Sequence, residues 1–407
     1  VFGTTVYAVS TVIASFFAGL ALGSHLFGKI ADKTRNPIRL YGLLEFSVGI
    51  YALLTLVLFT RVNSLWGAVY SIVGGNALLY SVTRFALCFL ILLVPTTLMG
   101  GSLPVLSRYF VRNMKHLGWD IGLIYSVNTF GALVGCFLVG FLLIRSAGIR
   151  NTLCMGVACN MMVALTAFIL SAREKERGGI ADTEAEVCSE PNTAGMNLSP
   201  LTVKLVLGAF AVSGFASLSY ELLWTRVLVY FIGVQTYAYT AMLMAFLFGI
   251  ALGSIVFARF TDSVRDNVFL FGAVEILIGL FSVAGLLSMG PVARVTDNIA
   301  MSGFVRTWWH YAGIKFLSAA LFMLAPTLLI GSTFPIVSKI LVDNLARISK
   351  SVGRIYALNT VGGIFGSILT GFLLLPLLGI RRSIMLIVAI NIGLGLALIM
   401  VSSRRKC

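Results

Sequence analysis

The sequence predicts an all-α polytopic membrane protein built from two repeats that point the same way through the bilayer. Of the 407 residues, 58% are hydrophobic and 11% are charged, whereas soluble domains carry about 25% charged residues. The apolar residues form runs of about 20, the length that crosses the hydrocarbon core as a helix. In addition, the second half of the chain repeats the first half in a constant register.

Eleven apolar runs are long enough to span a membrane, five in the first half of the chain and six in the second. They cover residues 2–28, 40–60, 85–108, 122–144, 150–171, 205–224, 234–258, 268–290, 312–339, 353–377 and 382–402. The run at 205–224 has no counterpart in the first half. We therefore expect a parent protein of twelve spans, whose first helix would precede Val1.

The runs divide the chain into four parts. We expect a first membrane repeat over 1–171, a cytoplasmic acidic linker over 172–204, a second membrane repeat over 205–402 and a basic cytoplasmic tail over 403–407. The linker is polar and lacks apolar periodicity, which is typical of a segment without a packed core.

The internal repeat is visible residue by residue. At an offset of 230, Gly19, Gly23, Asp32, Arg35 and Glu45 match Gly249, Gly253, Asp262, Arg265 and Glu275. At an offset of 231, Pro95, Pro104, Tyr125, Asn128, Gly131 and Gly135 match Pro326, Pro335, Tyr356, Asn359, Gly362 and Gly366. Six crossings separate a helix from its copy, so both repeats have the same direction. They should be related by an axis along the membrane normal, as in major facilitator transporters.

Loop charges predict the orientation. About 20 of the 30 Lys and Arg residues lie on one side of the predicted spans, which makes that side cytoplasmic. The C-terminus falls on the same side, and we expect a prokaryotic inner membrane. The net charge of +15 does not indicate nucleic acid, because the basic residues are spread over short loops between apolar runs. The expected surroundings are the lipid bilayer.

Four predicted helices carry a Gly-x-x-x-Gly pair, a spacing that lets two helix backbones approach closely in lipid. The pairs are Gly19/Gly23, Gly131/Gly135, Gly249/Gly253 and Gly362/Gly366. With a missing first helix counted, these are the second, fifth, eighth and eleventh helices, which join the two halves in the major facilitator plan. The pairs therefore fit either a seam on which the halves rock or static packing.

Two helices carry paired prolines with hydroxyl residues between them. The segments are Pro95–Pro104, which contains Thr96, and Pro326–Pro335, which contains Thr327. A proline removes one backbone hydrogen bond and kinks the helix, and hydroxyls or cavity water can satisfy the freed carbonyl. These are the fourth and tenth helices of the same plan, so the segments fit either a cavity lining or a structural kink.

Three of the fifteen acidic residues fall inside a predicted span, namely Glu45, Glu221 and Glu275. An ionised side chain at the bilayer centre costs roughly 2.5–3.5 kcal/mol. Glu45 and Glu275 follow the charged cytoplasmic turns Asp32–Arg35 and Asp262–Arg265 by about ten residues. They fit either pairing with the basic turn or binding of a cation or proton.

Glu221 lies in a polar and aromatic segment with Tyr220, Trp224 and Arg226 near the outer end of its helix. An ion pair with Arg226 and a role in a cavity or gate are both consistent with this arrangement.

Two further pairs, Tyr125/Asn128 and Tyr356/Asn359, lie one turn into their helices. They fit hydrogen bonds that fix helix contacts, or else gating or substrate contact.

Motifs for catalysis, cofactor binding and metal binding are absent from the sequence. The six cysteines form no Cys-x-x-Cys pair and the three histidines have no ligand spacing. No Gly-x-Gly-x-x-Gly turn, Walker loop or Ser-His-Asp set is present. We therefore expect no catalytic residue, no cofactor and no metal.

Three segments together resemble the membrane domain of the fused spermidine synthase family, also described as fused major facilitator–spermidine synthase proteins. They are Gly214-Phe-Ala-Ser-Leu-Ser-Tyr-Glu-Leu-Leu-Trp-Thr-Arg226, Gly249…Gly253-Ser and Tyr356-Ala-Leu-Asn-Thr-Val-Gly362. The turn Gly28-x-x-x-Asp32-x-x-Arg35 resembles the charged loop motif of major facilitator transporters. The resemblance covers nearly all of both halves. The family's soluble aminopropyltransferase-like half is not in this sequence, so the resemblance does not make the chain an enzyme.

These observations leave two main hypotheses. The first is a major facilitator-like transporter, or a membrane domain derived from one, for which the resemblance implies polyamines or related small cationic metabolites. The second is a non-transporting scaffold that anchors an aminopropyltransferase-like domain or serves as an accessory subunit of a membrane complex. The membrane portion of an enzyme that acts on a lipid-phase substrate ranks last. A water-filled central cavity would favour the transporter, and a packed apolar centre the scaffold.

Overall fold

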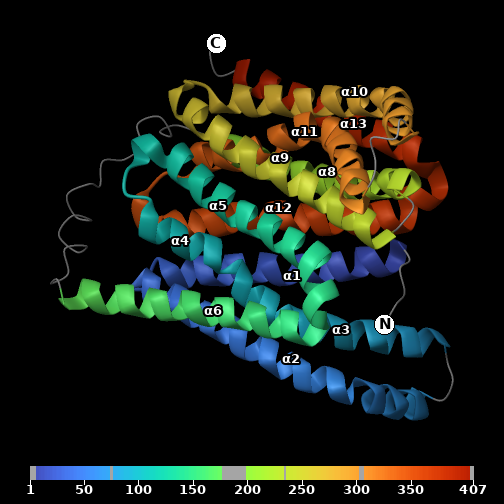
Figure 1. The fold of residues 1–407 in the computed structure, drawn as a ribbon. Helices are drawn as coiled ribbons and strands as arrows, with labels where there is room; N and C mark the ends of the chain where they lie inside the picture. The colour runs from blue at the N-terminus through green and yellow to red at the C-terminus, as the bar shows by residue number, and fades with distance from the viewer. Residues whose placement is uncertain (1–5, 74–76, 177–198, 233–234, 302–306, 404–407) are drawn as a thin grey trace.

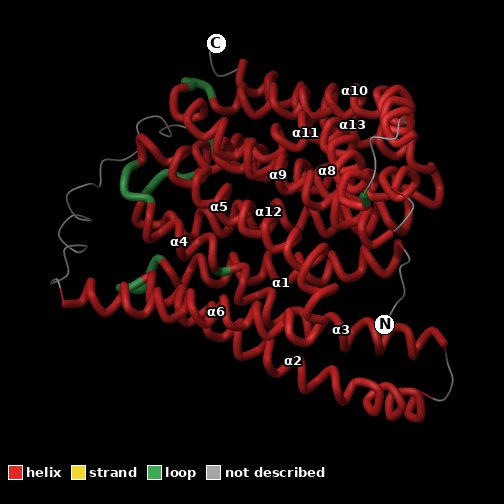
Figure 2. Tube along the Cα trace, viewed as in Figure 1, coloured by secondary structure: helices red, strands yellow, loops and turns green. Residues whose placement is uncertain are grey.

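The computed structural model of the chain describes residues 6–73, 77–176, 199–232, 235–301 and 307–403. These ranges form helices joined by short turns, and they contain no strand (Figure 2). Most of the expected linker, the last four residues and any helix before Val1 lie outside the described residues.

The first half of the chain contains six described α-helices, which Figure 1 draws from blue to green. They are α1 (Val6–Ala31), α2 (Pro37–Val73), α3 (Ala77–Gly100), α4 (Ser102–Phe110), α5 (Leu117–Phe137) and α6 (Ile144–Glu176). The second half contains α8 (Pro200–Ile232), α9 (Gln235–Ser263), α10 (Asn267–Met301), α11 (Trp308–Leu341), α12 (Ile348–Leu369) and α13 (Leu375–Ser403).

All eleven predicted spans correspond to helices of the structure. Nine helical stretches among the described residues are apolar and long enough to cross a membrane. Two of them, Met114–Arg173 and Leu345–Ser403, each contain two predicted spans. In both, the chain turns at a glycine with positive φ, Gly148 at 76° and Gly379 at 71°, a conformation that other residues rarely adopt. The chain is an integral membrane protein.

The helix contacts of the first half recur in the second half. Within the first half α1 packs on α3 and α2 on α6, and within the second half α9 packs on α11 and α10 on α13. Across the halves α1 packs on α12 and α5 on α9. Each contact is the repeat copy of another one. Short π-helical segments also recur in register, at Leu138–Leu143 and Thr370–Leu374.

Three of the four glycine pairs do not lie where the seam hypothesis places them. A Cβ atom built on Gly19 or Gly23 would overlap Thr96 or Thr97 of α3, within the first half. Two other pairs also pack on a helix of their own half. Gly249 and Gly253 contact Thr327 and Leu328 of α11, and Gly362 and Gly366 contact Ala211 and Phe215 of α8. The interpretation as a rocking seam is therefore wrong for these glycines, because they bring helices of one half together.

The pair on α5 has a different environment from its copy on α12. No described atom lies within 4 Å of a Cβ built on Gly131 or Gly135. Helix α8 covers the equivalent face of α12, and no described helix covers this face of α5. The helix expected before α1 by repeat symmetry would occupy the corresponding position, and it stays a prediction.

Replacing Gly362 with Leu should destabilise the fold, because the new side chain would displace the backbone of α8 at Ala211. Overpacking of this kind costs roughly 1–3 kcal/mol or more. The repeat copy provides a matched control, since Gly131→Leu adds a side chain to open space. Thermal unfolding of the purified chain in detergent measures both. Equal losses in the two variants would contradict the assigned environments.

Candidate functional site at the seam between the halves

The seam between the halves carries a polar contact at the end of the bundle where α1 and α9 finish. We call this the basic end; it lies on the left of Figure 1. Asp32, in the turn after α1, accepts hydrogen bonds from the backbone N–H groups of Ser349 (3.0 Å) and Lys350 (2.9 Å). These N–H groups open α12, whose first turn has no intrahelical acceptors for them. A carboxylate at this position also interacts favourably with the helix dipole. We call this contact the first latch.

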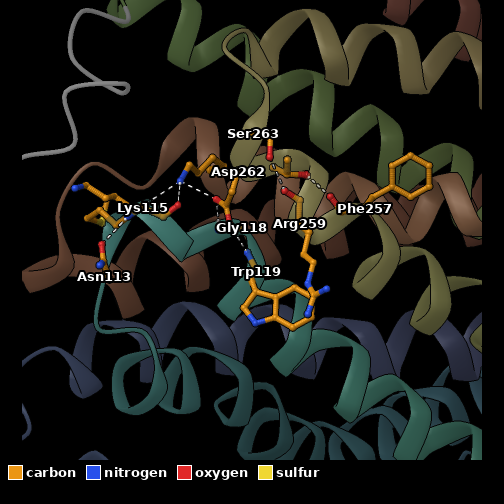
Figure 3. A network of polar contacts seen from close by, with 11 residues as sticks. Asn113, Lys115, Gly118, Trp119, Phe257, Arg259, Asp262 and Ser263 are labelled. Atoms are coloured by element: carbon orange, nitrogen blue, oxygen red, sulfur yellow. Dashed lines mark hydrogen bonds and ion pairs between the residues drawn. The ribbon is translucent and has the colours of Figure 1, made fainter.

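The second latch is the repeat copy of the first. Asp262, at the end of α9, accepts from the backbone N–H groups of Gly118 (3.0 Å) and Trp119 (2.9 Å) at the start of α5. Figure 3 shows the Asp262 carboxylate directed at this helix start. Since Gly118 and Trp119 precede Ser349 and Lys350 by 231 residues, duplication places each aspartate against the same backbone positions of the opposite half.

A basic side chain completes each latch. Arg108 donates from Nη1 to the carbonyl of Leu345 at 2.8 Å. Its copy Lys339 donates from Nζ to the carbonyls of Met114 (2.8 Å) and Lys115 (2.9 Å), and forms an ion pair with Asp262 at 2.7 Å. The two side chains of that pair are only 8% and 13% exposed, so solvent screens it weakly.

Small residues line the seam next to the latches. Ser254 donates to the carbonyl of Gly122 at 2.9 Å, and Ser126 donates to that of Ala251 at 2.6 Å. A Cβ atom on Gly28 of α1 would lie 2.7 Å from the Ser349 carbonyl oxygen of α12. These seam residues, rather than the predicted Gly-x-x-x-Gly pairs, bring the backbones of the two halves together.

A surface depression of about 480 Å³ opens beside the second latch. Its lining residues are Lys115, His116, Trp119, Arg259, Asp262 and Ser263. The Arg259 guanidinium lies 4.4 Å from the centre of the Trp119 ring (Figure 3), a cation–π geometry. The depression belongs to the latch surface and not to the centre of the bundle.

The predicted charged turns contribute their aspartates to the latches but not their arginines. Arg35 and Arg265 are exposed, while the latch cations are Arg108 and Lys339. Sequence reasoning missed these two residues, although they match each other in the repeat register and follow Pro104 and Pro335 by four positions.

The predicted proline segments approach the seam at their second proline. The carbonyl of Pro104 accepts from the Ser349 hydroxyl at 3.0 Å, and Pro335 lies 3.5 Å from a Cβ built on Gly122. Thr96 and Thr327 instead pack against the glycine pairs of α1 and α9. Near the first proline, therefore, the described contacts are with helices of the same half.

Two of the predicted tyrosines meet beside the basic end. The Tyr125 ring lies 4.9 Å from the Phe334 ring, and the Tyr356 ring lies 6.0 Å from Phe334. Phe210 of α8 joins them at 6.3 Å from Phe334. The four rings form one aromatic cluster, to which α5 contributes from the first half and α8, α11 and α12 contribute from the second.

The predicted asparagines have different environments. Asn359 donates to the carbonyl of Phe210 on α8 at 3.0 Å, a helix contact of the kind expected in lipid. Asn128, its copy, is exposed on the uncovered face of α5.

The segment around Glu221 is buried in α8. Tyr220 and Trp224 are each 1% exposed and Glu221 is 8% exposed. Leu218 and Leu222 of the same helix pack with Ile13 of the opposite half. Arg226 is partly exposed, and no ion pair joins it to Glu221 among the described residues.

Glu45 and Glu275 bind uncharged partners rather than the basic turns. Ser102 donates to Glu45 Oε1 at 3.2 Å. Asn391 donates to Glu275 Oε2 at 3.1 Å. Asn391 also went unnoticed in the sequence, although Asn160 occupies the same position of the first repeat.

Comparison with solved structures identifies this arrangement. The chain is similar to a bacterial homologue of the iron transporter ferroportin in its outward-facing state with soaked iron, at 12% identity and a TM-score of 0.53, covering 99% of this chain and 91% of that chain. It is similar to the proton:xylose symporter XylE of the major facilitator superfamily, bound to 6-bromo-6-deoxy-D-glucose, at 13% identity and a TM-score of 0.51, over 96% and 85% of the chains. The human organic anion transporter MFSD10 matches at 14% identity and a TM-score of 0.52, over 96% and 83%.

The chain has a major facilitator-like fold. No protein-family model matches the sequence, and no curated protein matches it. At 12–14% identity, the solved structures establish a shared fold. The resemblance to the fused spermidine synthase family stays a prediction from the sequence.

Replacing Asp262 with Asn should weaken the second latch specifically. Hydrogen bonds to a charged acceptor contribute about 1.5–3 kcal/mol, so the amide protons of Gly118 and Trp119 should exchange at least about tenfold faster. Hydrogen exchange resolved by residue measures this. Ser349 and Lys350, held by Asp32, are the internal control and should change less.

Asp32→Asn should reverse that pattern, with the larger change at Ser349 and Lys350. Unchanged protection of Gly118 and Trp119 in the Asp262 variant would contradict the latch.

Proposed function

We propose that the chain is a membrane transporter that opens a central site alternately to the two sides of the bilayer. The observation that carries this proposal is the pair of repeat-related latches, which joins the halves at the basic end by polar bonds. Such bonds are individually worth a few kcal/mol or less, so a rotation of one half against the other can break and re-form them.

The packing inside each half supports rigid halves. Glycine pairs bring α1 against α3, α9 against α11 and α12 against α8 at backbone distance. Most of the described polar bonds between the halves lie towards the basic end, and a longer one, from Cys136 to the Thr240 carbonyl at 4.0 Å, lies at the other end of α5 and α9. The structure then represents the state closed at the basic end, which we assign to the cytoplasmic side from the loop charges. Several similar transporters are described in an outward-facing or outward conformation, which fits this assignment.

The substrate class that we propose is a small organic cation, with a polyamine as the first compound to test. Glu221 supports this class, because it is a buried acid without a cation partner among the described residues. The sequence resemblance to the fused spermidine synthase family supports it as well. No metal or cofactor enters the proposal.

Removing both latch carboxylates should open the basic end. Spin labels at Arg112 and Ser263, both exposed and one in each half, would report the distance by pulsed electron resonance. The Asp32→Asn/Asp262→Asn double variant should show a second, longer distance population. Asp343→Asn, an exposed acid outside the latches, should keep the distribution of the parent chain. A single unchanged distance in the double variant would favour the scaffold hypothesis.

Reconstituted vesicles should take up labelled spermidine when they contain the chain. Glu221→Gln removes the buried negative charge and should reduce uptake at least about tenfold, the equivalent of 1.4 kcal/mol of lost interaction, while size-exclusion behaviour stays unchanged. Asp343→Asn should transport like the parent chain. Uptake no greater than that of empty vesicles would contradict a polyamine substrate, and the spin-label distances would then show whether the halves still move.

A further inference from the structure

A buried polar cluster lies inside the second half, away from the seam. Glu275 of α10 is 0% exposed and Asn391 of α13 is 2% exposed. Ser213 of α8 approaches the Glu275 carboxyl from a third helix. Two turns further along, Tyr220 of α8 and Ser282 of α10 form a second polar level on the same helix faces. None of these side chains belongs to the latches.

Two oxygen atoms of the Glu275–Asn391 pair have no hydrogen-bond partner. Asn391 Nδ2 donates to Glu275 Oε2 at 3.1 Å. The other oxygen of each group, Glu275 Oε1 and Asn391 Oδ1, has no hydrogen-bond partner and is inaccessible to solvent. Both of these atoms are acceptors when the carboxyl is ionised. Two buried acceptors without a hydrogen bond are costly, at about 1–3 kcal/mol each and more for a charged group.

An ionised Glu275 would also be a buried charge without compensation. Among the described residues, no cation pairs with it. Tyr220 of α8 is the other ionisable group that faces it, and the neighbours from α13 and α8 that contact it, Asn391 and Ser213, are uncharged. Taking an unpaired carboxylate out of water costs several kcal/mol.

One proton resolves both problems. A carboxylic acid and a primary amide can form a ring of two hydrogen bonds, in which the amide N–H donates to one acid oxygen and the acid O–H donates to the amide oxygen. The first of these bonds is present. A proton on Glu275 Oε1 would form the second bond with Asn391 Oδ1, satisfy both unpartnered oxygens and remove the buried charge.

We propose that Glu275 and Asn391 form a proton-binding site, in which Glu275 carries a proton on Oε1 and donates it to Asn391 Oδ1. The site binds one proton and needs no metal ion or other ligand. Loss of the proton leaves two acceptors facing each other between α10 and α13. Proton release therefore requires either water at the pair or separation of these helices. This site does not depend on the proposed transport function.

The first repeat contains the same two residue types, but there they are not fully buried. Glu45 and Asn160 match Glu275 and Asn391 in the repeat register, but both are partly exposed. Glu45 also has the Ser102 hydroxyl as a donor to Oε1, the atom whose counterpart in Glu275 has no partner. The argument for a bound proton therefore applies to the second half, where α8 covers the pair.

Infrared spectroscopy of the intact chain in lipid tests the proposal directly. At neutral pH the spectrum should contain the carbonyl band of a buried protonated carboxyl group. Glu275→Gln should remove this band and keep the fold, because its side-chain amide can donate to Asn391 Oδ1. Asp343→Asn should leave the band intact. A spectrum in which Glu275→Gln removes only carboxylate absorption would overturn the proposal.

A second variant tests the role of Asn391. It also keeps the proposal testable if the Glu275→Gln variant does not fold. Asn391→Ala retains the carboxyl but removes both hydrogen bonds, so the acid band should move to higher frequency, as expected for a free carbonyl. An acid band at the parent frequency in this variant would overturn the assignment of Asn391. Failure of spermidine transport would leave both spectra unchanged, so the two proposals can be judged separately.

Discussion

The cohesion of two helical halves in lipid depends on interactions other than apolar burial, because the lipid tails are as apolar as the helices. In this chain, two aspartates supply that cohesion at the basic end. Asp32 and Asp262 each accept two backbone N–H bonds from the first turn of a helix in the opposite half. Those N–H groups have no acceptor within their own helix, and the aspartates provide one.

The two kinds of helix contact have different consequences for motion. Contacts within a half involve glycines whose Cβ would overlap a neighbouring helix, such as Gly253 against Leu328, and close glycine contacts such as Gly353 against Ser24 also join the halves. The contacts within a half are extended and rigid, as close packing requires. Contacts between the halves combine small residues with charged bonds that are individually weak. In the proposed motion of the two halves, the latches and the aromatic cluster around Phe334 are the parts that must separate.

The three intramembrane acids illustrate how packing assigns different chemistry to one residue type. Glu45 accepts a hydroxyl bond and is partly exposed. Glu221 is buried in α8, and no described residue forms an ion pair with it. Glu275 is sealed between α8, α10 and α13 beside an amide. A carboxyl group in each place needs a different partner to offset its desolvation.

The sequence by itself determined the number of described spans, their common direction in the two halves and the aspartates of the charged turns. These follow from run length and from a repeat register that is independent of packing. It could not determine which way a side chain points around a helix. For that reason the sequence left the glycine pairs open between the seam and static packing, and three of them pack within the halves. Likewise Arg108 and Lys339, rather than Arg35 and Arg265, lie in the latches, and Glu275 binds Asn391 rather than a basic turn. Only the tertiary structure decides such pairings, because they join residues far apart in the sequence and depend on how each helix is rotated about its axis, which hydropathy does not encode.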